Sequence, residues 1–164
     1  MLKSYLSFGT LFVACLLVGC SGSGGASSSV DNTVRENLGA FPRINIVSTT
    51  DEALQIRYGY SFTRRVETGE DIYFETEWKD VITFDDEREQ GVDFVRVRIF
   101  LTARPRNRSA GSLASYATTF RAEVLQRVNM TGVWTEKDMS PERKEYIKEI
   151  ANYMETELRT QFRN

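Results

Sequence analysis

The stretch FVRVRIFLTA, residues 94–103, decides the fold class of this chain. Its apolar side chains stand at every second position, at Val95, Val97, Ile99 and Leu101, while Arg96, Arg98 and Thr102 stand between them. A period of two is typical of a β-strand with one buried face. The stretch therefore predicts a strand of an antiparallel sheet that turns its arginines away from the core.

The same alternation recurs on both sides of this stretch and predicts further strands. They cover residues 54–62, residues 72–78 with a continuation past a bulge to residue 84, and residues 116–128; the sequence RINIVS at 43–48 predicts a short additional one. Residues 54–66 could instead form a helical stripe, because Thr49 followed by Glu52 resembles a capping box. Period two accounts for more of the apolar positions, and Gly59 disfavours a helix, so we expect a strand.

A long helix is predicted after Ser140. That serine is a good N-cap, Pro141 suits the first helical position, and Glu142 suits the positive end of the helix dipole. Apolar residues then follow at steps of three and four: Ile147, Ile150, Ala151, Met154, Leu158 and Phe162. We expect an α+β fold, an antiparallel meander sheet of four or five strands with this one C-terminal amphipathic helix packed on one face.

The first twenty residues have the features of an export signal. Lys3 precedes an apolar run at 11–18, and the run ends in Leu17, Val18, Gly19 and Cys20. This ending resembles the lipobox of bacterial lipoproteins, in which the cysteine is acylated and the signal is cut just before it. The resemblance implies a signal peptide at 1–19, a lipidated Cys20 with a flexible Gly/Ser-rich tether at 20–40, and a single α+β domain at 41–164. The alternative is an ordinary secretory signal with an incidental cysteine.

A lipid anchor would hold the protein on a membrane without spanning it. In the lipoprotein family, Asp at the second mature position causes retention in the inner membrane. Ser21 stands there in this chain, so we expect the periplasmic face of the outer membrane, with the inner membrane or the cell surface as alternatives.

The residue types that the chain lacks exclude most catalytic chemistry. It has no histidine and two cysteines, of which Cys15 would leave with the signal and Cys20 would carry the lipid. Ser–His pairs, Cys–His pairs and imidazole metal sites are therefore excluded. We expect no enzyme activity, no cofactor and no metal. The net charge of −2 does not favour a nucleic-acid partner. Trp78 and Trp134 are expected in the core or at its rim.

A group of arginines is the candidate binding site. Alternate connections of a meander lie at the same end of the sheet, which places the following arginines together: Arg64, Arg65, Arg104, Arg106 and Arg108, with Arg159 and Arg163 of the helix. The acidic residues 85–89 fall at the opposite end. Guanidinium groups bind phosphate and carboxylate through paired hydrogen bonds. Anionic lipid, peptidoglycan or an acidic patch on an envelope protein are the expected partners. The alternative is that these charges serve solubility alone.

The order of elements resembles the LPS-assembly lipoprotein family, whose members plug the outer-membrane lipopolysaccharide translocon. The corresponding segments are IYFETEWKDVITF at 72–84, FVRVRIFLTA at 94–103 and ERKEYIKEIANYMETEL at 142–158. That family has a helix between its first two strands, where this sequence predicts a strand, and the resemblance assigns no site residue. We expect a non-catalytic, membrane-anchored accessory subunit or assembly factor of an envelope complex. The alternatives are a small-ligand or glycan-binding lipoprotein, and a carboxylate-based hydrolase using Glu75 and Glu77, which share a face of their predicted strand.

Overall fold

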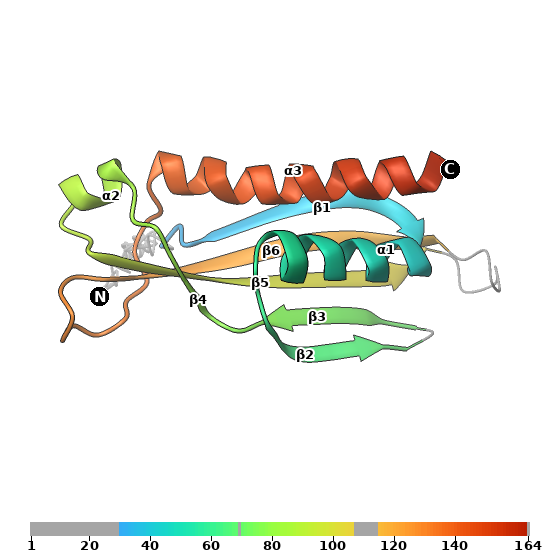
Figure 1. Cartoon of the computed structure of the whole chain (residues 1–164), viewed down its shortest axis with the longest axis horizontal. Helices are drawn as coiled ribbons and strands as arrows, with labels where there is room; N and C mark the ends of the chain where they lie inside the picture. Colours follow the sequence, from blue (N-terminus) through green and yellow to red (C-terminus); the bar gives the residue numbers. More distant parts are fainter. Residues whose placement is uncertain (1–29, 69, 107–114, 164) are drawn as a thin grey trace, which may run out of the picture.

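An antiparallel sheet of six strands forms the centre of the computed structural model, which describes residues 30–163 apart from residues 69 and 107–114 (Figure 1). The strands are β1 (Thr33–Pro42), β2 (Phe62–Glu67), β3 (Ile72–Thr76), β4 (Lys79–Val81), β5 (Phe94–Pro105) and β6 (Ser115–Arg127). Their order is β1-β6-β5-β3-β2, and β4 pairs with β5 beyond the end of β3. The helical segments are α1 (Arg43–Thr50), the π-helical η1 (Asp51–Arg57), α2 (Asp85–Glu89) and α3 (Pro141–Arg163).

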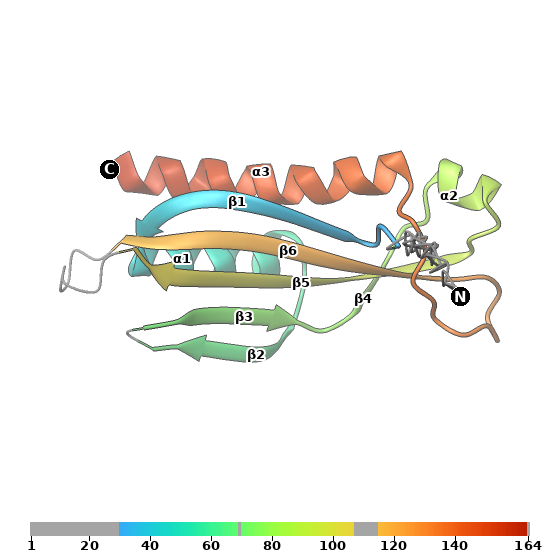
Figure 2. The same cartoon turned by 180° about the vertical axis from the view of Figure 1, so that it is seen from behind.

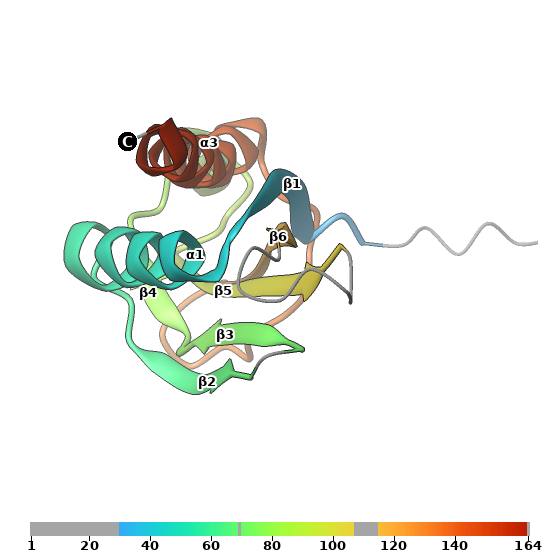
Figure 3. The ribbon, with the colours of Figure 1, turned by 90° about the vertical axis from the view of Figure 1, so that its right-hand side faces the viewer.

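Helices cover one face of the sheet and leave the other open. Viewed along the strands, α1 and α3 lie on the same side of the sheet (Figure 3). The core between them contains alternate residues of β5 and β6, and the α3 stripe Ile147, Ile150, Ala151, Met154 and Leu158. Ser140 caps α3 by accepting a hydrogen bond from the backbone N–H of Arg143. The predicted α+β class, with a C-terminal helix on one face of an antiparallel sheet, is confirmed.

The strands predicted at 43–48 and 54–62 are wrong, because this part of the chain is helical from Arg43 to Arg57. Ile46, Ala53 and Leu54 are buried at helical spacing, and burial against the sheet and α3 outweighs local strand preference. Gly59 does not interrupt the helix but follows its end with φ +62, the usual place of a C-terminal glycine. The next strand, β2, begins only at Phe62.

Residues 33–40 were assigned to the tether and are instead most of strand β1. Val34, Leu38 and Phe41 are buried, and β1 pairs with β6 along its length. Two features explain why the alternation of apolar and polar residues does not identify this strand in the sequence. The polar Glu36 takes a position on the covered side between Val34 and Leu38, and a bulge between Asn37 and Gly39 then shifts the phase.

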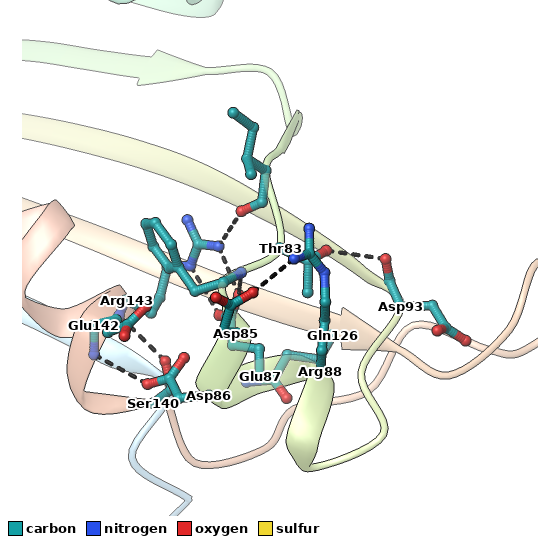
Figure 4. A network of polar contacts seen from close by, with 12 residues as sticks. Thr83, Asp85, Asp86, Glu87, Arg88, Asp93, Gln126, Ser140, Glu142 and Arg143 are labelled. Carbon is teal, nitrogen blue, oxygen red and sulfur yellow. Dashed lines mark hydrogen bonds and ion pairs between the residues drawn. The ribbon is translucent and has the colours of Figure 1, made fainter.

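The acidic residues 85–89 form helix α2, where a loop was predicted, and α2 is joined to the start of α3 by a buried ion pair (Figure 4). Arg143 donates from Nε and Nη2 to the Glu87 carboxylate, at 2.9 and 2.8 Å, and from Nη2 to the Ile82 carbonyl at 2.5 Å. Both side chains are 1% exposed. The predicted opposition of ends is seen in Figure 1, where α2 and the end of α3 lie far apart.

A bulge joins β3 to β4 but lies earlier than predicted, before Lys79 and not after Trp78, and the strand beyond it ends at Val81 and not at residue 84. Glu75 pairs with Phe100 and Lys79 with Val97, so the β3–β4 side has one residue more than β5 over the same span. The Thr76 hydroxyl accepts the hydrogen bond of the Ile99 N–H at this irregularity. Among the helices in the described ranges, none has the length and apolar content needed to cross a bilayer.

Candidate ligand-binding face of the sheet

The sheet face that no helix covers carries a line of arginines and aromatic rings (Figure 2 shows the sheet from this side). Its residues are those of β5 and β6 that alternate with the core positions, among them Arg96, Arg98, Arg121 and Arg127. The predicted outward direction of these strand arginines is therefore confirmed.

The arginines alternate with aromatic rings across this face. In order, the members are Arg127, Trp134, Arg96, Trp78, Arg98, Phe100 and Arg121, and we call this set the arginine ladder. Each neighbouring pair has its guanidinium carbon 4.0–4.8 Å from the ring centroid. A guanidinium over an aromatic face at this distance is held by cation–π attraction. The ladder therefore fixes several long side chains that would otherwise be mobile.

Trp78 was predicted at the end of a strand, on the side of its apolar residues, and Trp134 in the core or at its rim. Both instead lie outside the regular strands and contact the arginines of this face. Trp78 lies in the bulge between β3 and β4, and Trp134 lies in the connection from β6 to α3. That connection turns back at Asn129, which has φ +63 and whose N–H donates to the Asp93 carboxylate at 2.8 Å. Thr135 then pairs with Gln126 through two backbone hydrogen bonds, which holds Trp134 against the sheet.

One half of the ladder is neutralised by carboxylates. Arg98 donates to Glu75 at 3.2 Å and to Glu123 at 2.8 Å, and Arg121 pairs with Glu123 at 2.8 Å. Glu75 also accepts a hydrogen bond from the Tyr73 hydroxyl at 2.8 Å. Burial, followed by this hydrogen bond, raises the pKa of Tyr73.

The other half has uncompensated charge. Arg96 and Arg127 make no hydrogen bond or ion pair with any residue that the structure describes, and the Nε atoms of Arg96, Arg98 and Arg127 are buried without an acceptor. Burial is the main cause that lowers the pKa of Arg96; the Asp80 charge opposes this effect, and the charges of Arg127 and Arg98 add to it. Such guanidinium groups favour an anion beside them.

Two hollows continue this face toward β2. The larger, of about 520 Å³, is lined by Thr63, Arg64, Glu75, Thr76, Glu77, Trp78 and Arg98. The smaller, of about 230 Å³, is lined by residues that include Arg64, Tyr73, Thr102 and Arg104. The uncovered face thus carries arginines from Arg127 at one end of the sheet to Arg104 at the other, with carboxylates among them in its middle.

The structure separates the arginines that the sequence grouped together. Arg64 and Arg65 lie in strand β2 and not in a connection, because the preceding segment is helical. Arg64 shares the smaller hollow with Arg104, whose Nε is 3.6 Å from the carboxylate of the exposed Asp71. Arg65 turns to the helical side and donates from Nη1 to Asp51 at 2.8 Å, so its charge is compensated.

The remaining members lie on a different surface or beyond the described residues. Arg106 lines a hollow of about 550 Å³ with Arg159, beside the end of β1. Arg159 also makes the i,i+4 pair with Glu155 that its spacing predicts. Arg108 lies outside the described residues, as does the side chain of Arg163.

The carboxylate pair considered for hydrolysis lies in the larger hollow. Glu75 and Glu77 both line it, but Glu75 is engaged by Arg98 and Tyr73. Within the described ranges, no group of three or more acidic, cysteine or histidine side chains could hold a metal ion.

Comparisons with family models and with curated proteins identified no relative of this chain. No family model matches this chain, and no curated protein does. Its function is therefore inferred from its residues and their geometry.

Proposed function

We propose that this protein is a lipid-anchored, non-catalytic binding protein of the bacterial envelope, an accessory subunit or assembly factor that receives an anionic partner on the uncovered face of its sheet. One observation carries the proposal: Arg96 and Arg127 have no acceptor among the described residues, on a face that none of the described helices covers.

Solubility alone does not require this arrangement. An exposed sheet face needs polar side chains, but mobile ones serve as well, and fixing a long side chain costs up to about 2 kcal/mol of rotamer entropy. Rings hold the ladder arginines in place before any partner arrives. Pre-organised donors favour binding, because less ordering remains to be done at the moment of contact.

The described chain begins beside α3. Asp31, near the start of the edge strand β1, pairs with Lys144 of α3 at 2.6 Å, so a tether from Cys20 would join the domain beside the start of α3. The helical segment between β1 and β2 also stands where the resemblance to the LPS-assembly lipoproteins implies a helix, which supports an accessory role at the outer membrane.

A second candidate is a small-ligand or glycan-binding lipoprotein. The hollow beside Trp78 favours it, because an aromatic wall with arginine and carboxylate side chains can hold a polar ring. Binding of a soluble ligand without any protein partner would distinguish it from an accessory subunit.

The test is purification of the full lipidated protein from its own envelope in mild detergent, followed by mass spectrometry. The variant Arg96→Glu/Arg127→Glu is compared with Arg88→Glu/Lys148→Glu, which makes the same charge change at exposed positions on helices. We expect the wild type and the control variant to co-purify with a stoichiometric partner, and we expect Arg96→Glu/Arg127→Glu to lose that partner. No partner for any version would argue against an accessory subunit, and equal loss from both variants would argue against this face.

A further inference from the structure

We propose that Arg96, Trp134 and Arg127 form a binding site for a phosphomonoester group. The inference rests on the proposed function, because it names the chemical group that the uncovered face would recognise. It is specific to one half of the ladder and does not extend to Arg98 and Arg121.

The geometry brings two guanidinium groups to one place. Arg96 stands opposite Leu125 in the β5–β6 register, so Arg127 is its diagonal neighbour on the same face. Such neighbours are about 7–8 Å apart. Their guanidinium carbons are 4.4 and 4.6 Å from the centroid of the same Trp134 ring. The distance between the two carbons therefore cannot exceed the sum of these two distances. A phosphate group with three terminal oxygens can accept hydrogen bonds from two such groups.

The donors that would reach the ligand are the terminal nitrogens. The Nε atoms of both arginines are buried, whereas their Nη atoms are not among the buried unpaired atoms of the described residues. The rings thus hold each guanidinium with its inner edge covered and its outer nitrogens free. This orientation suits a ligand that approaches from solvent.

The charge of the site favours a dianion. No carboxylate of the described residues forms an ion pair with Arg96 or Arg127. Glu123 pairs with Arg98 and Arg121, and Asp93 accepts the Asn129 N–H. Asp80 is exposed and stands opposite Arg96 in the β4–β5 register, so its charge acts on Arg96 without an ion pair between them. Two guanidinium groups without an ion pair therefore remain. A phosphomonoester carries −1.5 to −2 at pH 7, whereas one carboxylate would leave a positive charge uncompensated.

The other half of the ladder supplies the control. Arg121 stacks on Phe100 at 4.0 Å but already has Glu123 as its partner. Arg121→Gln therefore removes a ladder arginine of similar environment without removing a free charge. The two tryptophans supply the signal, because the rings of both Trp134 and Trp78 contact Arg96.

The experiment uses the lipidated full-length protein in phosphatidylcholine vesicles, with tryptophan emission as the readout. Glycerol 3-phosphate tests a soluble ligand, and vesicles containing phosphatidic acid test a lipid headgroup. Acetate and phosphatidylserine, at matched ionic strength and surface charge, test general attraction of anions. We expect a saturable change with at least one phosphomonoester source. Arg96→Gln and Arg127→Gln should weaken it about tenfold or more, equivalent to at least 1.4 kcal/mol, and Arg121→Gln by less than about twofold.

Several outcomes would overturn the site. They are an equal response to acetate or phosphatidylserine, equal weakening by Arg121→Gln, or no saturable response to either phosphomonoester source. Arg96→Lys keeps the charge and is a control for variants that fail to fold. Its circular dichroism should be unchanged, and it should still weaken binding, because a lysine cannot donate two parallel hydrogen bonds. If no phosphomonoester binds but Arg96→Glu/Arg127→Glu still loses the envelope partner, only the phosphate assignment fails. If the phosphomonoester binds but no partner is found, the accessory function fails.

Discussion

Removal of Arg143 should destabilise the domain far more than removal of any exposed arginine. In Arg143→Met, the Glu87 carboxylate would stay buried without its cation, and the Ile82 carbonyl would lose a donor. Breaking a fully buried pair from one side costs about 3–5 kcal/mol, because an uncompensated charge remains. Both side chains here are 1% exposed, so we expect the full range.

The measurement is urea unfolding at pH 7, followed by tryptophan fluorescence. For a domain of this size, such a loss should also lower Tm by roughly 10–20 °C. Arg88→Met is the matched control. Its pair with Asp85 lies on the same short helix, but the two side chains are 59% and 86% exposed, so the change should stay below about 1 kcal/mol.

The double variant Glu87→Leu/Arg143→Met tests the cause. It removes both charges, so it should be no less stable than Arg143→Met alone, although the Phe84 N–H would lose its acceptor. A loss below about 1 kcal/mol in Arg143→Met, or strict additivity of the two single changes, would contradict the assignment of the cost to an unpaired buried charge.

Three further changes test other features. Burial raises the pKa of Tyr60 above its ordinary value, so the free energy of unfolding should be unaffected by this group below about pH 10 and should fall as pH rises above it. Tyr60→Phe should remove this alkaline loss in urea unfolding measured over a series of pH values. The Tyr60 hydroxyl has no partner among the described residues, so the same variant should cost less than about 1 kcal/mol at pH 7. Gly39→Ala should destabilise by about 1–2 kcal/mol, because φ is +110 and a Cβ would lie 3.2 Å from the Phe41 ring, and chemical denaturation should show a larger loss than for Gly91→Ala, where φ is +76 but nothing lies within 4 Å. Cys20→Ser should abolish both the incorporation of labelled palmitate and the cleavage of the signal peptide. A Cys20→Ser protein that is still labelled would refute the lipobox assignment.

The sequence predicted those elements whose side-chain period is uninterrupted. Strand β5 and helix α3 each bury one continuous set of positions, Val95 to Leu101 and Ile147 to Leu158, so local pattern and tertiary packing agree. Helix α1 with η1 failed for the opposite reason. Ile56, which supported the period-two reading, is 79% exposed, and only contacts from α3 and the sheet decide which residues face inward.

The candidate site could be predicted only in part. Alternation in β5 and β6 placed Arg96 and Arg127 on the outer face, but the ring between them comes from a connection whose path depends on the Gln126–Thr135 pairing. The grouping of Arg64 with Arg65 failed because neighbouring residues of a strand point to opposite faces. A basic stripe on one face and a tryptophan in a nearby connection were the available signals, and neither alone predicts a stack.

The extra residue between Thr76 and Lys79 bears on how sequences related to this one should be aligned. Even-numbered residues face the core before it and odd-numbered residues after it, so loss of one residue there would reverse inside and outside for all of β4. Chain length in this stretch is therefore constrained by the strand pairing, independently of the side chains it carries. Sequences that share the fold should show no gaps between Thr76 and Lys79.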